Sequence, residues 1–131
     1  MKNYYRAVVV AADFATAVER VRAELAAEGF GVITEVDVAA TLKAKLGVTF
    51  EDYVILGACI PPLAHEALKA DRRMGLLLPC NVVVRSEGSE TVVETLDPKL
   101  LVALADNSEL DWIADDAGAR LERVLTRVAC S

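Results

Sequence analysis

Gly75 to Leu96 reads GLLLPCNVVVRSEGSETVVETL, and this stretch decides the fold class of the chain. Two β-rich runs, Gly75–Arg85 and Thr91–Leu96, flank the segment SEGS, in which Glu87-Gly88 is a turn signal. Such a pattern is typical of a β-hairpin. A hairpin requires an antiparallel pair of strands, so the sheet is expected to be mostly antiparallel.

On either side of the hairpin, strand patterns alternate with helix patterns. Apolar spacing, caps and breakers predict these elements in chain order: a strand at Tyr4–Val10, a helix between the N-cap Asp13 and Gly29, a strand at Phe30–Val38, a helix at Ala39–Leu46, a strand at Tyr53–Ala58, a helix from Pro61 to Ala70, the hairpin, a short helix after Asp97-Pro98, and a long helix from Leu110 to Val128. The order β-α-β-α-β-α-β-β-α predicts an α+β two-layer sandwich with the helices on one face of the sheet.

Length and composition indicate one globular domain over residues 1–131, with 54% hydrophobic residues. The net charge is −6 and the basic residues are scattered, which disfavours nucleic acids and anionic membranes as partners. No apolar run approaches the roughly 18 residues of a membrane helix. The chain has three cysteines, an odd number that argues against a disulfide framework. We therefore expect a cytoplasmic protein with reduced thiols.

The segment Gly57–Leu68, GACIPPLAHEAL, places a cysteine, two prolines and the single histidine close together. Cys59 ends a predicted strand just before a helix N-terminus, a position that favours anions and lowers the pKa of a thiol. Helical geometry places His65 about 130° from the buried face of its helix, so we do not expect a core histidine. Cys80 follows a proline in the hairpin, and its neighbour Asn81 offers an amide.

Three functional interpretations of these residues remain open. The first is a pocket near Cys59, His65 and Cys80 for a small molecule or a soft metal ion, although the spacing C-x5-H-x14-C matches no standard zinc module. The second is a thiol-dependent enzyme with Cys59 as nucleophile and His65 as base, oriented by Glu35 or Glu66. In the third, the cysteines only fill space and the chain is a structural interaction module that uses its sheet or the face around Trp112.

Three segments, EGFGVITEVDVAATLKAKLG, YVILGACIPPLAHEAL and GLLLPCNVVV, resemble the domain-of-unknown-function family 302. The resemblance covers nearly the whole chain and implies a small α+β domain that forms a homodimer. The family's recurrent positions fall here on Gly29, Phe30, Glu35, Lys45, Gly57, Cys59, Pro62, Ala64, Pro79, Cys80 and Asn81. Where the family commonly has an asparagine after the first cysteine, this chain has Ile60.

The family brings no activity with it, so ligand, cofactor and reaction are unknown from the sequence. The leading hypothesis is a dimeric binding or accessory domain. Its ligand-binding residues are expected to include Cys59, His65, Cys80, Asn81 and Glu35.

Overall fold

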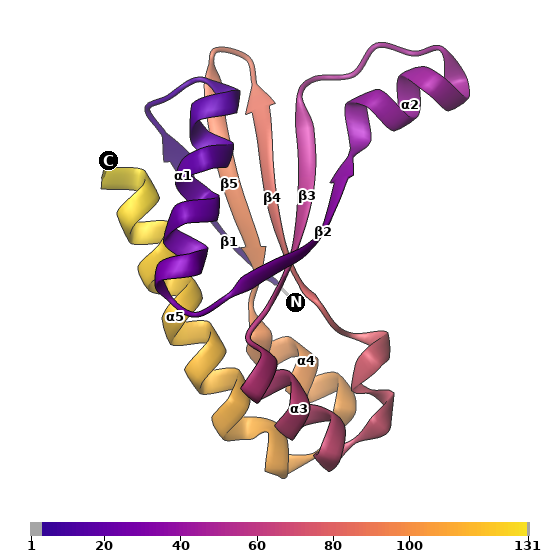
Figure 1. Ribbon diagram of the computed structural model, residues 1–131, viewed down its shortest axis with the longest axis vertical. Helices are drawn as coiled ribbons and strands as arrows, with labels where there is room; N and C mark the ends of the chain where they lie inside the picture. The colour runs from indigo at the N-terminus through magenta and orange to yellow at the C-terminus, as the bar shows by residue number, and fades with distance from the viewer. Residues whose placement is uncertain (1–3, 131) are drawn as a thin grey trace.

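The computed structural model describes residues 4–130, which form a five-stranded antiparallel sheet with helices on one face and at one end (Figure 1). The strand order is β1-β5-β4-β3-β2, so the first two strands of the chain lie at opposite edges. The hairpin strands, β4 and β5, lie in the interior of the sheet. The α+β class and the order of elements predicted from the sequence are confirmed.

The strands and helices have the following bounds: β1 Tyr5–Val10, α1 Phe14–Ala27, β2 Gly31–Asp37, α2 Val38–Leu46, β3 Tyr53–Cys59, α3 Pro61–Ala70, the 3-10 helix η1 Arg72–Leu76, β4 Cys80–Glu87, β5 Glu90–Leu96, α4 Pro98–Ala105, the 3-10 helix η2 Ser108–Leu110, and α5 Asp111–Cys130.

Local signals determine where the first helix begins and ends. The Asp13 carboxylate accepts a hydrogen bond from the Thr16 backbone N–H at 2.8 Å, which satisfies one of the free donors in the first turn. At the other end, Gly29 has φ +88°, a left-handed conformation that side chains rarely adopt. Both ends of α1 are therefore those predicted from Asp13 and Gly29.

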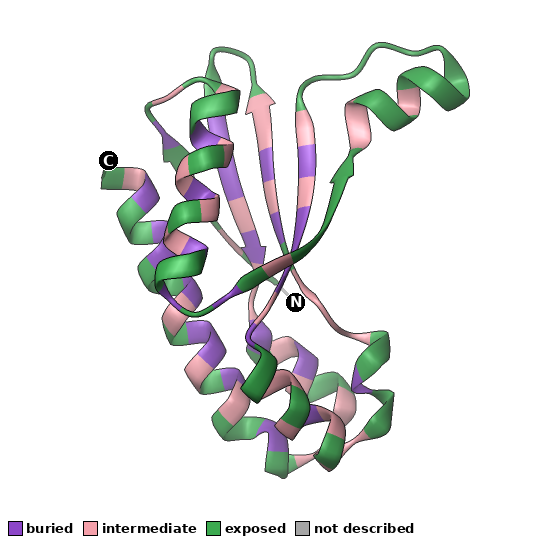
Figure 2. Ribbon diagram, in the orientation of Figure 1, coloured by how far each residue is buried: buried purple, intermediate pink, exposed green. Residues whose placement is uncertain are grey.

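Helices α1 and α5 cover one face of the sheet and bury the main core between the layers (Figures 1 and 2). Alternate residues of the central strands point into this core, among them Leu56, Val82 and Val84, each with no exposed surface. The helices contribute leucines and valines at helical spacing, including Leu25 of α1 and Leu121 of α5. Burial of this apolar surface is the main force that holds the two layers together.

The N-terminal half of α5 extends past the sheet and packs against α3, α4 and η2, while η1 packs against α3 (Figure 1). These short elements form a helical end layer with its own small core around Ala67, Met74 and Leu110. Because α5 is 20 residues long, about 30 Å, one helix can contribute to both cores.

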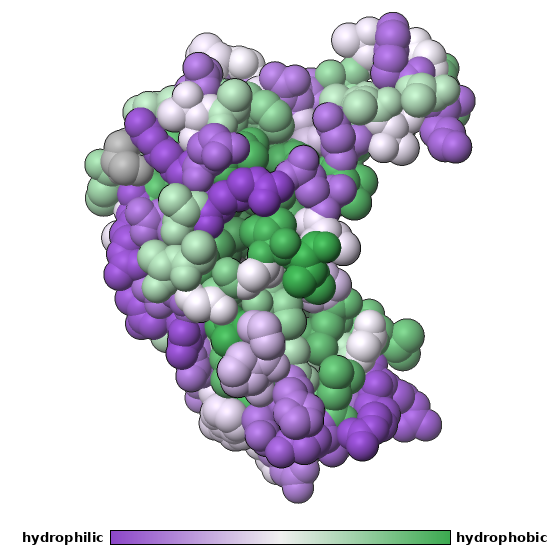
Figure 3. Space-filling view, in the orientation of Figure 1, coloured by the Kyte–Doolittle hydropathy of each residue, from purple (hydrophilic) through white to green (hydrophobic). Residues whose placement is uncertain are grey.

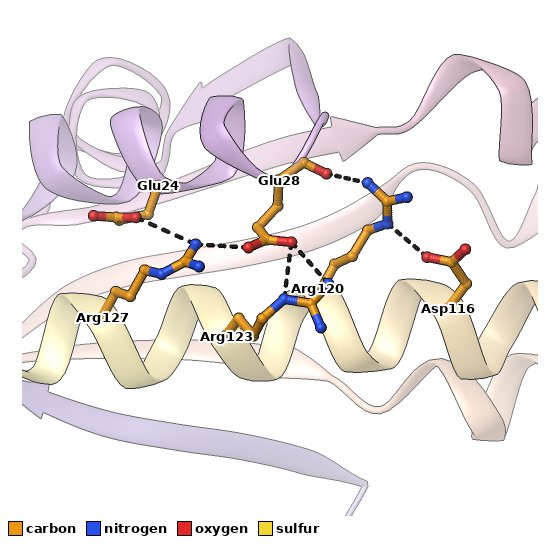
Figure 4. A network of polar contacts seen from close by, with 6 residues as sticks. All are labelled: Glu24, Glu28, Asp116, Arg120, Arg123 and Arg127. Carbon is orange, nitrogen blue, oxygen red and sulfur yellow. Dashed lines mark hydrogen bonds and ion pairs between the residues drawn. The ribbon is translucent and has the colours of Figure 1, made fainter.

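A cluster of charged side chains joins the end of α1 to α5 (Figure 4). Glu28, which is 8% exposed, accepts hydrogen bonds from Arg123 at 2.9 and 3.0 Å and from Arg127 at 2.6 Å. Arg120 donates to the backbone carbonyl of Glu28 at 2.6 Å and to Asp116 at 2.5 Å. The carbonyl is one that the helix end leaves without an intrahelical partner.

One part of the predicted hairpin is wrong. Residues Gly75–Pro79 were expected to begin a strand, but Arg72–Leu76 is a 3-10 helix and β4 starts at Cys80. The Asp71 side chain accepts from the Arg73 backbone N–H at 2.9 Å and so caps the 3-10 turn. Pro79 has no backbone N–H for a sheet ladder, which places the strand start after it.

The opposite face of the sheet has no helix over it within residues 4–130 (Figure 1). Strand register gives the side chains on this open face: Tyr5, Val9, Tyr53, Ile55, Asn81, Val83, Arg85, Val92, Glu94 and Leu96. Arg85 donates to Glu94 at 2.6 Å and to Glu87 at 2.9 Å. No helix in this described part of the chain has the length and apolar character needed to cross a bilayer.

Candidate functional site

A small pocket lies where the ends of β3 and β4 meet the helical end layer. It has a volume of about 50 Å³, and carbon and sulfur atoms form nearly all of its wall. Strand β3 contributes Ala58 and Cys59 to the wall. Helix α3 contributes Leu63 and Ala64, and helix α5 contributes Ala114 and Ala117. The pocket thus lies between the main core and the small core of the helical end layer.

Cys59 and Cys80 both line this pocket. Cys80 pairs with Ala58 in the register of β3 and β4, and Cys59 is the next residue after Ala58. Both side chains are half-buried. Two thiols that are 21 positions apart in the sequence are thereby brought to one cavity, as the leading hypothesis requires.

Burial controls the acidity of both thiols. Burial is the larger cause and the neighbouring Cys59, whose thiolate would repel a second one, is the smaller; together they raise the pKa of Cys80 to about 11. Burial also raises the pKa of Cys59. The expectation that the start of α3 would lower the Cys59 pKa is therefore wrong, because burial raises the pKa of this thiol.

His65 lies outside this pocket. Its side chain is exposed on α3, as its helical position predicted, and it is not among the lining residues. The structure therefore brings together the two cysteines of the predicted trio but not the imidazole. A base for a Cys59 nucleophile is missing from the cavity wall.

The two other predicted ligand-binding residues also lie elsewhere. Glu35 of β2 is exposed and forms an ion pair with Arg22 of α1. Asn81 is exposed on the open face, where it lines a shallow groove with Tyr53, Val83 and Glu94. Neither residue contributes to the wall around Cys59 and Cys80.

Metal binding by the original trio finds no geometric support. Within residues 4–130, no three side chains drawn from histidine, cysteine, aspartate and glutamate lie close enough to hold an ion. The pocket does contain one further sulfur, the thioether of Met74 from η1. Thiolates and thioethers are the ligands that soft ions such as Cu(I) prefer.

Sequence reasoning missed Met74 and the aliphatic lining. Met74 reaches the pocket through η1, of which only the last two residues, Gly75 and Leu76, fall within the predicted strand. Ala114 and Ala117 of α5 were expected only as part of an apolar stripe. These two small residues, three positions apart on the stripe, were the sequence signal for a cavity, because alanine side chains on one helix face leave a space that leucine side chains would fill.

Comparison with known proteins agrees with this architecture. The family described as "Domain of unknown function DUF302" matches residues 6–128. A crystal structure titled as an uncharacterized conserved DUF302 protein from Bacillus stearothermophilus superposes with a TM-score of 0.89 at 32% sequence identity. The match covers 95% of this chain and 98% of that one. Among curated proteins, no match is found.

Proposed function

This chain belongs to the DUF302 family, and on that premise we propose that it is a cytoplasmic, homodimeric binding domain that holds a small, largely apolar ligand in the pocket between Cys59 and Cys80. The observation that carries the proposal is the position of the two thiols. They belong to separate segments of the family resemblance, yet both cysteines line one cavity at the boundary of two packed layers. Small-molecule sites are typically concave, mostly apolar and equipped with a few polar groups.

The lining restricts the chemistry of the ligand. None of the wall residues carries a charge, so an ionised group would lose its hydration without gaining a partner. The two thiols offer weak S–H donors and polarizable sulfur atoms. A neutral compound of a few heavy atoms fits a volume of about 50 Å³.

A soft metal ion is the second candidate, because Cys59, Cys80 and Met74 line the same pocket. Binding would require both thiols to lose their protons, and their raised pKa values make affinity increase with pH.

The proposed cytoplasmic location also rests on the thiols, because no disulfide bond joins Cys59, Cys80 or Cys130. The thiol-enzyme alternative has no comparable support, because burial makes Cys59 less acidic and His65 is outside the pocket.

Xenon is a suitable probe for the apolar-ligand proposal, because a single apolar atom fits a cavity of about 50 Å³, with ¹H–¹⁵N NMR as the readout. We expect dissolved xenon to shift the amide signals of pocket residues in the wild type and not in Ala64→Leu, whose larger side chain occupies the cavity. Ala23→Leu, an exposed position on α1, is the matched control and should behave as the wild type. Absence of shifts in the wild type would refute the apolar site.

Anaerobic titration with Cu(I) against a coloured chelator tests the second candidate. We expect one equivalent to bind, and Cys59→Ser or Cys80→Ser to abolish binding. Cys130→Ser, which changes an exposed thiol, should leave binding intact. If all three variants compete equally with the chelator, the pocket sulfurs do not form the metal site.

A further inference from the structure

Two thiols lie together in the pocket wall. Cys80 pairs with Ala58 in the register of β3 and β4, so Cys80 lies within one residue of Cys59 across the strand pair. Both cysteines line the same cavity. The charge of an ionised Cys59 raises the pKa of Cys80, an effect that only near neighbours exert. A ligand in this pocket can therefore meet two thiols at once, which a lone cysteine does not offer.

The wall around the thiols restricts the charge that an occupied site can carry. The lining residues, all within the described part of the chain, include no lysine, arginine, histidine, aspartate or glutamate. An ion in such surroundings loses its hydration and gains no counter-charge. The favoured occupant is one that leaves itself and both sulfur atoms without net charge.

This condition distinguishes among the species that bind sulfur. A Cu(I) ion held by two thiolates leaves one net negative charge in the pocket and releases two protons. A divalent soft ion held by two thiolates is neutral, but it arrives as a hydrated dication and also releases two protons. Burial opposes both routes, because it raises the pKa values of Cys59 and Cys80 and keeps the thiols protonated.

A hydroxide of a soft trivalent element meets the condition at every step. Arsenous acid is uncharged at neutral pH and condenses with protonated thiols. Two S–H bonds and two As–O bonds break, while two As–S bonds and two O–H bonds form. Each thiol proton leaves in a water molecule, and the oxidation state of arsenic does not change. The reaction therefore needs no base, oxidant or counter-ion, and the wall of this pocket supplies none.

Size and surroundings also suit a small neutral hydroxide. A cavity of about 50 Å³ admits a molecule of a few heavy atoms. Figure 3 shows hydrophobic side chains on the concave side of the molecule, between α2 and the helical end layer. A neutral solute loses less hydration than an ion when it approaches apolar surface of this kind.

We propose that the pocket takes the neutral hydroxide of a soft trivalent element, arsenous acid being the example tested, with Cys59 and Cys80 as its two covalent ligands. One hydroxyl stays on the arsenic and completes its three bonds. Met74 then packs beside the bound group without ligating it. The inference rests on the pocket of the proposed function and names the class of its ligand.

Incubation of the reduced protein with sodium arsenite under anaerobic conditions, followed by native mass spectrometry, provides the test. We expect one adduct whose mass equals arsenous acid less two water molecules, since two thiols condense and one hydroxyl remains. Cys59→Ser and Cys80→Ser should lose this adduct. Cys130→Ser, which changes an exposed thiol, is the matched control and should keep it. A wild type without the adduct, or the same adduct on Cys80→Ser, would overturn the proposal.

The pH dependence of arsenite binding tests the chemistry on the wild type, without any substitution. Condensation of protonated thiols exchanges no proton with the solvent, so the dissociation constant should change less than about twofold between about pH 6 and pH 8. Release of two protons would instead tighten binding about 100-fold per pH unit. A dependence that steep would show that thiolates bind the arsenic, which contradicts the proposal.

The xenon experiment separates this inference from the proposed function. If xenon shifts the amide signals of pocket residues and arsenite gives no adduct, the apolar pocket stands and only the arsenic inference fails. Ala64→Leu, which fills the cavity, should lose both the xenon shifts and the arsenite adduct, while Ala23→Leu should keep both. An arsenite adduct that persists on Ala64→Leu would place the arsenic outside the pocket and overturn the inference.

Discussion

Cys59 and Cys80 share one pocket wall, and the proximity of Cys59 makes the Cys80 thiol less acidic than burial alone would. With its pKa raised to about 11, Cys80 is ionised in only about one molecule in a thousand at pH 8. This relationship determines how the two thiols respond to pH and to electrophiles.

Alkylation by iodoacetamide should therefore separate the three cysteines. At pH 8 we expect the exposed Cys130 to react first, Cys59 more slowly and Cys80 last, because the thiolate is the reactive form. Between pH 8 and 10 the Cys80 rate should rise about tenfold per unit. Peptide mass spectrometry measures each rate; Cys80 reacting as fast as Cys130 would contradict its burial.

Thr91 and Thr95 lie on the core face of β5 and are both buried, but their hydroxyls differ. Thr91 donates to the Ala12 carbonyl at 2.8 Å, whereas the Thr95 hydroxyl has no hydrogen-bond partner within the described residues. Thr95→Val should raise the free energy of unfolding by about 1 kcal/mol, because it removes an unsatisfied buried group. Thr91→Val should lower it by about the same amount. Urea unfolding measures both, and equal effects of the two substitutions would refute this assignment.

Gly57 lies where β3 passes between Thr34 and Pro79. A side chain there would overlap the Thr34 hydroxyl and approach the Pro79 ring to 2.8 Å. We expect Gly57→Ala to lower the free energy of unfolding by about 1–3 kcal/mol through overpacking. Adding Thr34→Ala should restore part of that loss, which a double-mutant cycle measures. Strict additivity of the two changes would show that the clash is not with Thr34.

The pairing of Glu28 with the α5 arginines predicts acid sensitivity. Hydrogen bonds from Arg123, followed by those from Arg127, hold the pKa of Glu28 below its ordinary value of 4.5. Because the pKa of Glu28 is lower in the folded state than in the unfolded chain, its ionised carboxylate stabilises the fold. This contribution is complete above pH 4.5 and is lost as the pH falls through the pKa of the folded state. Glu28→Gln should therefore melt at a lower temperature than the wild type at pH 7, and the difference should shrink on acidification.

Glu66→Gln is the control for this comparison. Glu66 pairs with Lys69 at 2.9 Å, and both side chains are about half exposed. Exposed pairs of this kind contribute little to stability. If Glu28→Gln shows the same melting temperature as Glu66→Gln at every pH, then Glu28 does not stabilise the contact between α1 and α5.

Local signals in the sequence predicted most of the fold. Asp13, Gly29 and the Glu87-Gly88 turn act on their immediate neighbours, so their effect can be inferred without tertiary structure. The error at Gly75–Pro79 arose because a short leucine run suits a strand as well as a 3-10 turn. The Asp71 cap was a local signal for the turn.

The candidate site was less predictable because it depends on register between distant strands. Helical geometry correctly placed His65 away from the core, since that inference needs one helix only. The meeting of Cys59 with Cys80 depends on the pairing of β3 with β4, and the entry of Met74 depends on η1. The raised pKa values depend on an apolar wall built from four further elements, which no local pattern encodes.

Native mass spectrometry of protein purified from its own host tests the central claim most directly, because it reports retained mass and subunit count together. The account predicts that the wild type carries a small added mass, a neutral compound or a soft metal ion, and that Ala64→Leu does not, while Ala23→Leu keeps it. Wild-type protein without added mass, or an identical mass on Ala64→Leu, would contradict binding in the pocket between Cys59 and Cys80.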